Sequence, residues 1–273
     1  MTAERTGLAA AGAPVRPPET RRRVPLEPIR HPLQAIGAAC VALAALSLLL
    51  PSAPTYDPMA WLIWGREIAH LGLSTTDGPS WKPLPVAFTT LFAPTGSAAP
   101  WLWLVVARSG GLIALAMSYR VAARLAGRAA GLIAAAGLAL SHEWMRDSWL
   151  GNSEGVLLAL LLLAVDRHLS ERPRQALVLG FLAGLLRPEA WPFLGLYGLW
   201  LWVRRPALRR LGLVLAALTF VLWFVPEEIG SGDLLRASAR ARMPATCSTR
   251  PRVASSCASV RAAEAPSATL PCC

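Results

Sequence analysis

The stretch YDPMAWLIWGREIAHLGLSTTDGPSWKPLP, residues Tyr56–Pro85, decides how we expect the rest of the chain to be arranged. It follows an apolar run, residues 33–50, that is long enough to span a bilayer. It carries an acid next to a proline, three tryptophans and the single lysine of the sequence, Lys82. We therefore expect a functional loop at a membrane surface, held by apolar segments on either side.

The composition indicates an integral membrane protein. Of 273 residues, 54% are hydrophobic and only 16% are charged, and the mean hydropathy is +0.44, which is too apolar for a soluble domain of this size. The net charge of +11 could indicate nucleic-acid binding, but the charges form short clusters between apolar runs. Membrane topology explains such clusters better, and we expect no nucleic-acid partner.

The predicted fold class is all-α, a polytopic transmembrane helix bundle with about seven spans. The apolar runs are residues 33–50, 100–118, 129–140, 156–165, 176–186, 191–203 and 211–225. Some are short: the twelve residues between Arg174 and Arg187 rise only about 18 Å as a helix, against a hydrocarbon core of about 30 Å. Snorkelling arginines, local thinning or burial among other helices would make up the difference.

Charge bias sets the predicted orientation, because loops rich in arginine stay on the cytoplasmic side. With the N-terminus inside, all seven spans place most arginines inside and most acids outside. This predicts a multi-pass protein of the plasma (inner) membrane with a cytoplasmic N-terminus. The first apolar run also resembles a signal peptide, but its length and the poor cleavage site at PSAPTY favour an uncleaved anchor.

The sequence divides into three predicted regions. Residues 1–32 are rich in proline and arginine and should be a disordered cytoplasmic tail. Residues 33–230 form the transmembrane domain, with an outer loop at 51–98. Residues 231–273 form an irregular tail that breaks the charge rule, since residues 234–273 carry six arginines and one glutamate on the predicted outer side. We hypothesise that the tail from about Met243 is read out of frame or is a truncation scar, so that the natural protein would be longer, which resequencing the locus would test.

The outer loop begins with a predicted amphipathic helix. Asp57 and Pro58 fit an N-cap followed by a proline at the first helical position. A stripe of Trp61, Trp64, Ile68 and Leu71 suggests that this helix lies flat at the membrane interface, where tryptophan is favoured. Asp57 therefore has two readings that do not exclude each other: a helix cap, or a general base that faces both the membrane surface and water.

Two cations near this loop are candidate ligands. Lys82 stands between a tryptophan and two prolines and could bind a phosphate or simply snorkel at the surface. Arg108 lies in the outer half of the second span, and a charge within the membrane is a functional candidate by default. We expect its partner to be an outer-loop acid or a lipid phosphate.

The later outer loops add further candidates. Asn152 or Ser153 is a natural N-cap, with Glu154 in the first turn of the helix that follows. Arg187 and Glu189 flank Pro188 in a tight turn, where they either pair with each other or bind a ligand. The four histidines and five cysteines show no metal-binding spacing, and we expect no metal site from them.

The order of these segments resembles that of a known family. A first span, an outer loop that opens with Asp57, WKPLP at 81–85, GNSEG at 151–155 and LLRPEAWP at 185–192 are similar to the GT-C superfamily of membrane glycosyltransferases. Within it, the chain most resembles actinobacterial relatives of the protein mannosyltransferase and aminoarabinose transferase group. The resemblance covers residues from about 33 to 242.

The resemblance implies an inverting transfer of a hexose or pentose from a polyprenyl-phosphate donor to a lipid, glycan or protein acceptor outside the membrane. It implies that Asp57 is the general base and that Lys82 binds the leaving phosphate, assisted by Arg108 or Arg187, with Glu154 and Glu189 as further substrate-binding candidates. Pro58 and Trp81 stand where relatives often have acids, which leaves a divalent metal open; no other cofactor is expected.

Two other classes remain as alternatives to such an enzyme. One is a nonfunctional fragment of it. The other is a membrane transporter or lipid-binding scaffold, for which the sequence should show inverted repeats or broken helices with paired charges in the membrane.

Overall fold

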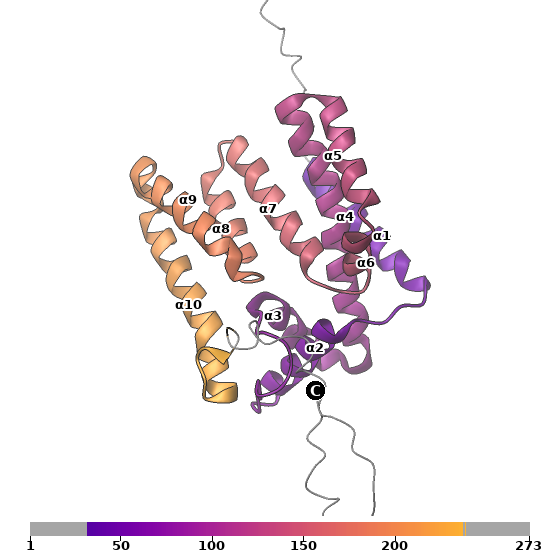
Figure 1. The fold of residues 1–273 in the computed structure, drawn as a ribbon, viewed down its shortest axis with the longest axis vertical. Helices are drawn as coiled ribbons and strands as arrows, with labels where there is room; N and C mark the ends of the chain where they lie inside the picture. The colour runs from indigo at the N-terminus through magenta and orange to yellow at the C-terminus, as the bar shows by residue number, and fades with distance from the viewer. Residues whose placement is uncertain (1–31, 237, 239–273) are drawn as a thin grey trace, which may run out of the picture. The chain divides into compact units, whose positions relative to one another are not determined.

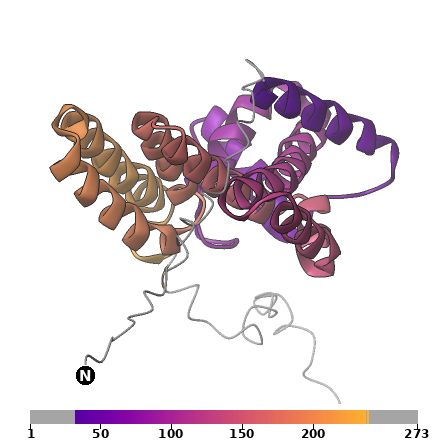
Figure 2. The ribbon, with the colours of Figure 1, turned by 90° about the horizontal axis from the view of Figure 1, so that it is seen from above.

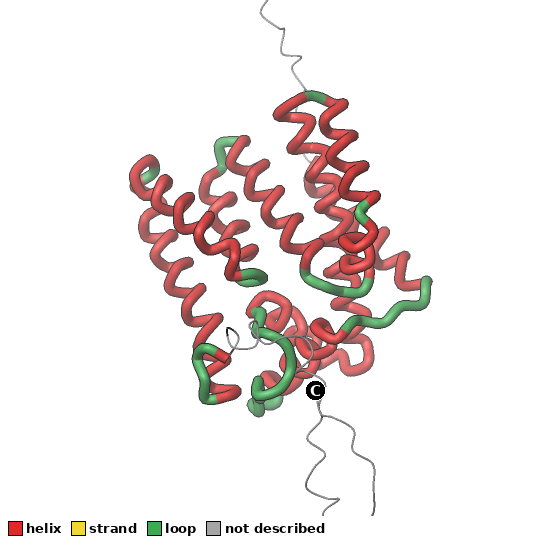
Figure 3. The backbone as a smooth tube through the Cα atoms, viewed as in Figure 1, coloured by secondary structure: helices red, strands yellow, loops and turns green. Residues whose placement is uncertain are grey.

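The computed structural model describes residues 32–236 and 238, and within this range every regular element is a helix (Figures 1 and 3). The α-helices are α1 (Pro32–Leu46), α2 (Tyr56–Ala69), α3 (Pro83–Phe92), α4 (Ala99–Ala126), α5 (Arg128–Leu140), α6 (His142–Trp149), α7 (Glu154–Leu169), α8 (Pro173–Gly184), α9 (Trp191–Arg204) and α10 (Arg209–Ser231). Short 3₁₀ turns are η1 (Ser47–Leu49), η2 (Ala93–Ala98), η3 (Pro188–Ala190) and η4 (Pro206–Leu208). The predicted all-helical class is confirmed.

Each of the seven apolar runs falls in a helix, but few of these helices are long. By length and composition, Pro83–Ala126 and Pro206–Ser231 could each cross a membrane. The pair α6 and α7, bent by 105° at a short break, would make a third if it counts as one span. Within the described residues the structure thus supports two or three membrane-crossing helices, fewer than the seven predicted. The other runs form shorter apolar helices packed beside them.

The centre of the bundle is α7, which lies between α4 on one side and α8 on the other (Figures 1 and 2). Glycine permits the close approach of α4 and α7, because a Cβ on Gly155 would lie 2.8 Å from the backbone nitrogen of Gly111. Helix α8 is too short to cross a bilayer, and five of its twelve residues are buried among its neighbours. Burial of short helices, one of the expected remedies for their length, is therefore present in α8.

Helices α2 and α3 pack together at one end of α4 (Figure 1). Their contact is built from tryptophans: Trp61 and Trp64 of α2 are 1% and 2% exposed and pack with Trp81 and with Trp103 of α4. The stripe that we expected to face the membrane interface is therefore turned into the protein. Leu71, the last predicted member, lies beyond the end of α2 with a positive φ of 58° and is 96% exposed.

The outer surfaces of several helices are apolar. Large hydrophobic side chains are exposed along α5, α9 and α10, including Leu132, Ile133, Phe193, Leu196, Val214 and Phe220. Contiguous exposed apolar surface on a monomer marks an interface with lipid or protein. Membrane association explains this surface and agrees with the two or three helices of crossing length.

The predicted terminal tails lie mostly outside the described residues. Residues 1–31 and 239–273, on which the disordered N-terminal tail and the out-of-frame tail were predicted, receive no structural description. The last described segment is nevertheless informative: α10 ends at Ser231, and Arg236 beyond it is buried against the fold at 6% exposure. The folded part of the chain thus continues beyond residue 230, where we expected the transmembrane domain to end.

Candidate functional site

Asp57 lies in the first turn of α2, but it is not the cap of this helix. The N-cap position is Thr55, and α2 begins at Tyr56. Thr55 is tied to the loop before α7, since its backbone nitrogen donates to Leu150 O at 3.1 Å and its hydroxyl to Asn152 Oδ1 at 2.7 Å. The prediction that Asp57 caps the helix is therefore wrong, and its carboxylate remains available for another contact.

That contact is Lys82. The lysine precedes α3 in an extended conformation, followed by Pro83 at the first helical position. Its Nζ lies 3.6 Å from Asp57 Oδ2 and 3.5 Å from the hydroxyl oxygen of Ser153. It also lies 4.9 Å from the centroid of the Trp61 ring, which is a cation–π distance. The predicted acid and cation therefore meet, although 25 residues of chain separate them in the sequence.

The Lys82 ammonium is nearly buried, with 9% of the residue exposed. Burial lowers the pKa of Lys82 below the ordinary lysine value, because desolvation disfavours the charged form. Asp57 and Glu154 raise the pKa again by attraction, whereas Arg187 lowers it by repulsion. Four of the predicted site residues, Asp57, Lys82, Glu154 and Arg187, therefore interact within one group, which we call the Lys82 cluster together with Ser153.

Glu154 and Arg187 form an ion pair at the edge of this cluster. Glu154 opens α7 directly after Ser153, and Arg187 follows the end of α8. The expected pair of Arg187 with Glu189 is thus replaced by one with Glu154. The second oxygen of Glu154, Oε2, is buried and has no hydrogen-bond partner among the described residues. A buried acceptor left unpaired is costly and points to a ligand or a water molecule.

A cavity of about 760 Å³ opens beside the cluster, between α7, α8 and α9. Glu154, Arg187 and Glu189 line it at the end near Lys82, and apolar side chains such as Leu157, Leu161 and Phe193 line the part farther along α7. His168 and Tyr197, joined at 3.1 Å, lie at its opposite end. Glu189 therefore reaches the cavity but not the Lys82 cluster. A charged end and an apolar body suit an amphiphilic ligand.

Arg108 is separate from this cluster. It is 3% exposed, and its guanidinium donates to Ser47 O at 3.0 Å, to Trp149 O at 3.1 Å and to the hydroxyl of Ser52. Its Cζ also lies 4.0 Å from the Trp149 ring centroid. Of the two expected partners, an outer-loop acid and a lipid phosphate, the acid is not among these contacts. Arg108 connects α4 to the residues that follow α1 and lies apart from the other predicted site residues.

Two neighbours of Lys82 were not predicted for the site. Ser153 was read only as a helix cap, yet its hydroxyl faces the ammonium, and Trp61 was assigned to the membrane interface, yet its ring lies under the ammonium. No local pattern identifies such partners, because each comes from another helix. Among the described residues, no three His, Cys, Asp or Glu side chains are grouped so that they could hold a metal ion.

No family model, curated protein or solved structure matches this chain. The fold and the site by themselves define an apolar helical protein, with helices long enough to cross a membrane, in which a buried ammonium lies beside a partly exposed carboxylate at the charged end of an apolar cavity.

Proposed function

We propose that this protein is a membrane glycosyltransferase that moves a sugar from a polyprenyl-phosphate donor to an acceptor at the extracytoplasmic face. The observation that carries the proposal is the Asp57–Lys82 pair, 3.6 Å apart, beside the charged end of an apolar cavity. A transferase with a lipid-linked donor needs a base, a cation for the phosphate and a place for the lipid. Asp57, Lys82 and the neighbouring apolar cavity are candidates for these three parts and lie close together in the fold.

Each charged group has a distinct role in the proposed reaction. Lys82 and Arg187 hold the donor phosphate and stabilise the negative charge that grows on it as it leaves. Asp57, whose side chain is 39% exposed, accepts the proton of the acceptor hydroxyl while that oxygen attacks the anomeric carbon. The bond between the anomeric carbon and the phosphate oxygen breaks, polyprenyl phosphate departs, and the anomeric configuration is inverted.

The cavity supplies a path for the lipid. Its apolar part follows α7 from Glu154 to His168, and fourteen helical residues rise about 21 Å. An isoprenoid chain along this path would place its phosphate at the Glu154–Arg187 end. Glu189 lines the same end and is placed to accept hydrogen bonds from sugar hydroxyls.

The charged groups at the two ends of α7 fit the predicted orientation with a cytoplasmic N-terminus. The Lys82 cluster surrounds the start of α7, whereas Arg120, Arg124 and Arg167 gather around Asp166 near its end. The arginine-rich end is the one that charge bias assigns to the cytoplasm. In this orientation the Lys82 cluster faces the extracytoplasmic side, where lipid-linked sugars are used in the cell envelope.

The test is transfer by the purified full chain in liposomes, supplied with polyprenyl phosphate that carries labelled mannose or arabinose and with a membrane extract as acceptor. The Asp57→Asn variant should lose transfer by about 10²–10⁴-fold, the usual contribution of a general base. Its abundance in the membrane should not change. Glu143→Gln, which alters an exposed acid of α6, is the matched control and should behave as wild type. Equal turnover by Asp57→Asn and wild type would reject Asp57 as the base.

A second candidate is a lipid-binding scaffold without catalysis, which the same cavity favours. The bend of 105° between α6 and α7 also provides the broken helix that the transporter alternative requires. A scaffold would bind the labelled donor at the Lys82 cluster without releasing polyprenyl phosphate from it. A transporter would move the donor across sealed liposomes with its sugar still attached. Release of polyprenyl phosphate would favour the transferase over both.

A further inference from the structure

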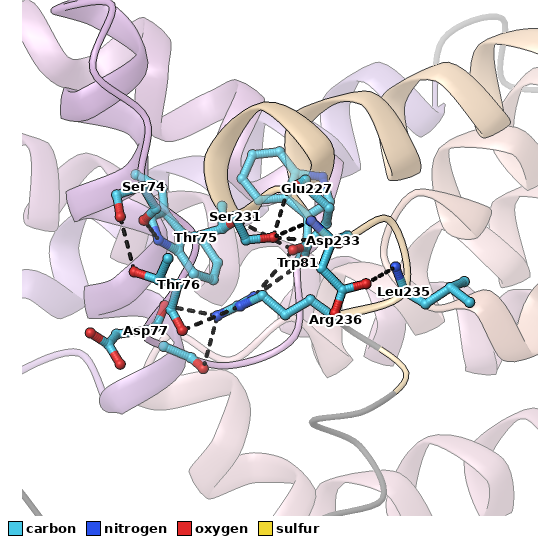
Figure 4. Close-up of polar contacts among 12 residues, drawn as sticks. Ser74, Thr75, Thr76, Asp77, Trp81, Glu227, Ser231, Asp233, Leu235 and Arg236 are labelled. Atoms are coloured by element: carbon cyan, nitrogen blue, oxygen red, sulfur yellow. Dashed lines mark hydrogen bonds and ion pairs between the residues drawn. The ribbon is translucent and has the colours of Figure 1, made fainter.

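The segment that delivers Lys82 to the site has no regular structure. Between the end of α2 and Lys82, residues 74–81 form a loop whose contacts with α10 are shown in Figure 4. The first residue is held by α2, since Ser74 N donates to Glu67 Oε2 at 3.0 Å and Trp64 Nε1 donates to Ser74 O at 3.1 Å. From Thr75 onward the hydrogen bonds that attach the loop to other elements go to α10 and to Arg236 after it, while the Trp81 ring also packs against Trp64 of α2.

Glu227 and Arg236 form the centre of these contacts (Figure 4). Arg236 Nη1 lies 3.3 Å from both carboxylate oxygens of Glu227, and the two residues are 6% and 1% exposed. Arg236 Nη2 donates to Asp77 O at 2.9 Å, and Thr75 Oγ1 donates to Glu227 Oε2 at 3.3 Å. One ion pair therefore grips the loop at two points, through a backbone carbonyl and through a side chain.

Further hydrogen bonds, from the backbone and from a tryptophan ring, attach the loop to α10 as far as the residue before Lys82. Thr75 N donates to Gly230 O at 3.0 Å, and a Cβ on Gly230 would lie 2.7 Å from Thr75 Oγ1, so only glycine permits this approach. Trp81 Nε1 donates to Leu222 O at 3.0 Å. The loop is thus attached to α10 at both of its ends, and its last attachment is one residue from the ammonium.

We propose that the Glu227–Arg236 pair is a positioning device for Lys82, which locks the loop 74–81 onto α10 so that the ammonium is held beside Asp57. As a statement about geometry it depends only on the contacts of the loop, whereas its importance for turnover rests on the proposed glycosyltransferase function. Neither residue touches the Lys82 cluster in the described contacts, so both act through the loop.

Physical reasons favour this role over a contribution to stability alone. A buried ion pair is a poor source of stability, because the cost of desolvating both charges offsets their attraction, and it serves best to fix one arrangement. Lys82 has a flexible stem, and its distance to Asp57 is set by where its backbone is held. An error of about 1 Å in the placement of a reacting group can cost on the order of 10²-fold in rate. A loop without regular structure needs such a lock.

The single lysine of the sequence gives a readout that does not require transferase activity. The full chain in detergent is acetylated with acetic anhydride over a range of pH, and mass spectrometry follows the peptide that contains Lys82. The midpoint of the profile reports the pKa of Lys82, and the plateau at high pH reports its accessibility. The variants are Glu227→Gln, Arg236→Gln and the double variant, in which no charge is left unpaired. Glu228→Gln, at the exposed neighbouring position, is the matched control.

We expect the Glu227 and Arg236 variants to change both the midpoint and the plateau of the acetylation profile. The midpoint should rise towards the ordinary lysine value as Lys82 gains contact with water, and the plateau rate should rise roughly tenfold, because the loop opens locally. Glu228→Gln should leave both unchanged. In the transfer assay, kcat should fall roughly 10²-fold in the double variant with a smaller change in the KM of the donor. If the double variant does not fold, Thr75→Val removes the hydrogen bond from Thr75 to Glu227 and leaves the ion pair intact.

The outcomes separate this inference from the proposed function. An unchanged Lys82 profile in a folded double variant, or in Thr75→Val where the double variant does not fold, overturns the positioning role whether or not the protein transfers sugar. If the Lys82 profile shifts in the variants as expected but the wild-type protein transfers no sugar, the positioning role is supported and the transferase is rejected.

Discussion

Two charged clusters mark the two ends of α7, and they differ in how fully the oxygens of their acids are hydrogen-bonded. The Asp166 cluster places one fully buried carboxylate among three guanidiniums: Arg120 Nε at 2.9 Å, Arg124 Nη1 at 2.6 Å, and Arg167. The Lys82 cluster has looser contacts of 3.5–3.6 Å around the ammonium, a partly exposed Asp57 and an unpaired Glu154 oxygen. Both oxygens of the Asp166 carboxylate accept hydrogen bonds, although Arg167 Nε has no partner among the described residues. In the Lys82 cluster a carboxylate oxygen itself is left unpaired.

This difference separates structure from function within one helix. A buried carboxylate whose two oxygens are both hydrogen-bonded fixes the packing of its helices and has no unpaired oxygen left for a ligand. A network with spare acceptors and donors beside a cavity keeps its bonding capacity for something that enters. Changes to the two clusters should therefore be felt in different measurements, in folding for Asp166 and in turnover for Lys82.

The largest effect is expected from Lys82→Gln. Loss of a charged donor to the leaving phosphate should lower kcat by about 10²–10³-fold, the range found when one donor to a developing negative charge is removed. The midpoint of thermal unfolding in detergent should change little. Lys82→Arg, which keeps the charge, is the control and should retain more activity than Lys82→Gln. An equal loss of kcat in both variants would show that the shape of the side chain at this position, and not its charge, determines the rate.

Asp166→Asn should act on folding instead. Three arginines would lose their shared carboxylate, at a cost of about 3 kcal/mol in unfolding free energy, the lower end for a broken buried pair because the guanidiniums stay partly exposed. Denaturant unfolding in detergent measures this. Glu171→Gln breaks the exposed pair with Arg205, 3.4 Å apart, and should cost less than about 1 kcal/mol. Similar stability losses in the two variants would contradict the structural role of the Asp166 cluster.

A smaller effect is expected when the cavity between the clusters is filled. Leu161→Trp adds volume to its apolar wall and should raise the KM of the lipid-linked donor roughly tenfold, since the fit of an apolar pocket is worth about 1–3 kcal/mol. Leu132→Trp, on the exposed face of α5, is the matched control. A normal donor KM in a folded Leu161→Trp variant would remove the cavity from the donor site.

The smallest effect concerns pH. Burial lowers the pKa of Lys82, so the ammonium loses its proton at a lower pH than an ordinary lysine does, and transfer should decline above that pKa. Arg187 lowers this pKa by repulsion, so Arg187→Gln should move the alkaline limb of the rate profile to higher pH. In Lys82→Arg this limb should vanish, because a guanidinium stays charged. A limb that moves to lower pH in Arg187→Gln would contradict the assigned electrostatics.

The sequence predicts the helices well because apolar runs and prolines are local signals. All seven runs lie largely in helices, and Pro83 and Pro173 stand at the first position of theirs, where proline is favoured. The pairing of Asp57 with Lys82 could also be anticipated, since both lie in the loop between the first two runs. Sequence length alone could not show how many of these helices cross a membrane.

The wrong predictions are of two kinds: what packs against the apolar face of a helix, and which distant residue pairs with a charged side chain. Periodicity places Trp61 and Trp64 on one stripe, but it cannot distinguish a membrane surface from the helices α3 and α4 that cover this stripe. The partner of Arg187 was sought two residues away and is found on α7. Arg236 belonged to a tail that breaks the charge rule, yet it pairs with Glu227 and grips a loop almost 160 residues earlier in the sequence. Contacts of this range require the fold.

The central claim is that lipid phosphate binds at the Lys82 cluster and not at the arginine-rich Asp166 cluster. A polyprenyl phosphate with a photoactivatable diazirine next to its phosphate tests this directly, when it is cross-linked to the full chain in liposomes and mapped by mass spectrometry. We predict adducts on peptides that contain Lys82 and Glu154–Leu161, reduced by unlabelled donor. Competed adducts confined to the peptides around Arg120, Arg124 and Asp166 would contradict the claim.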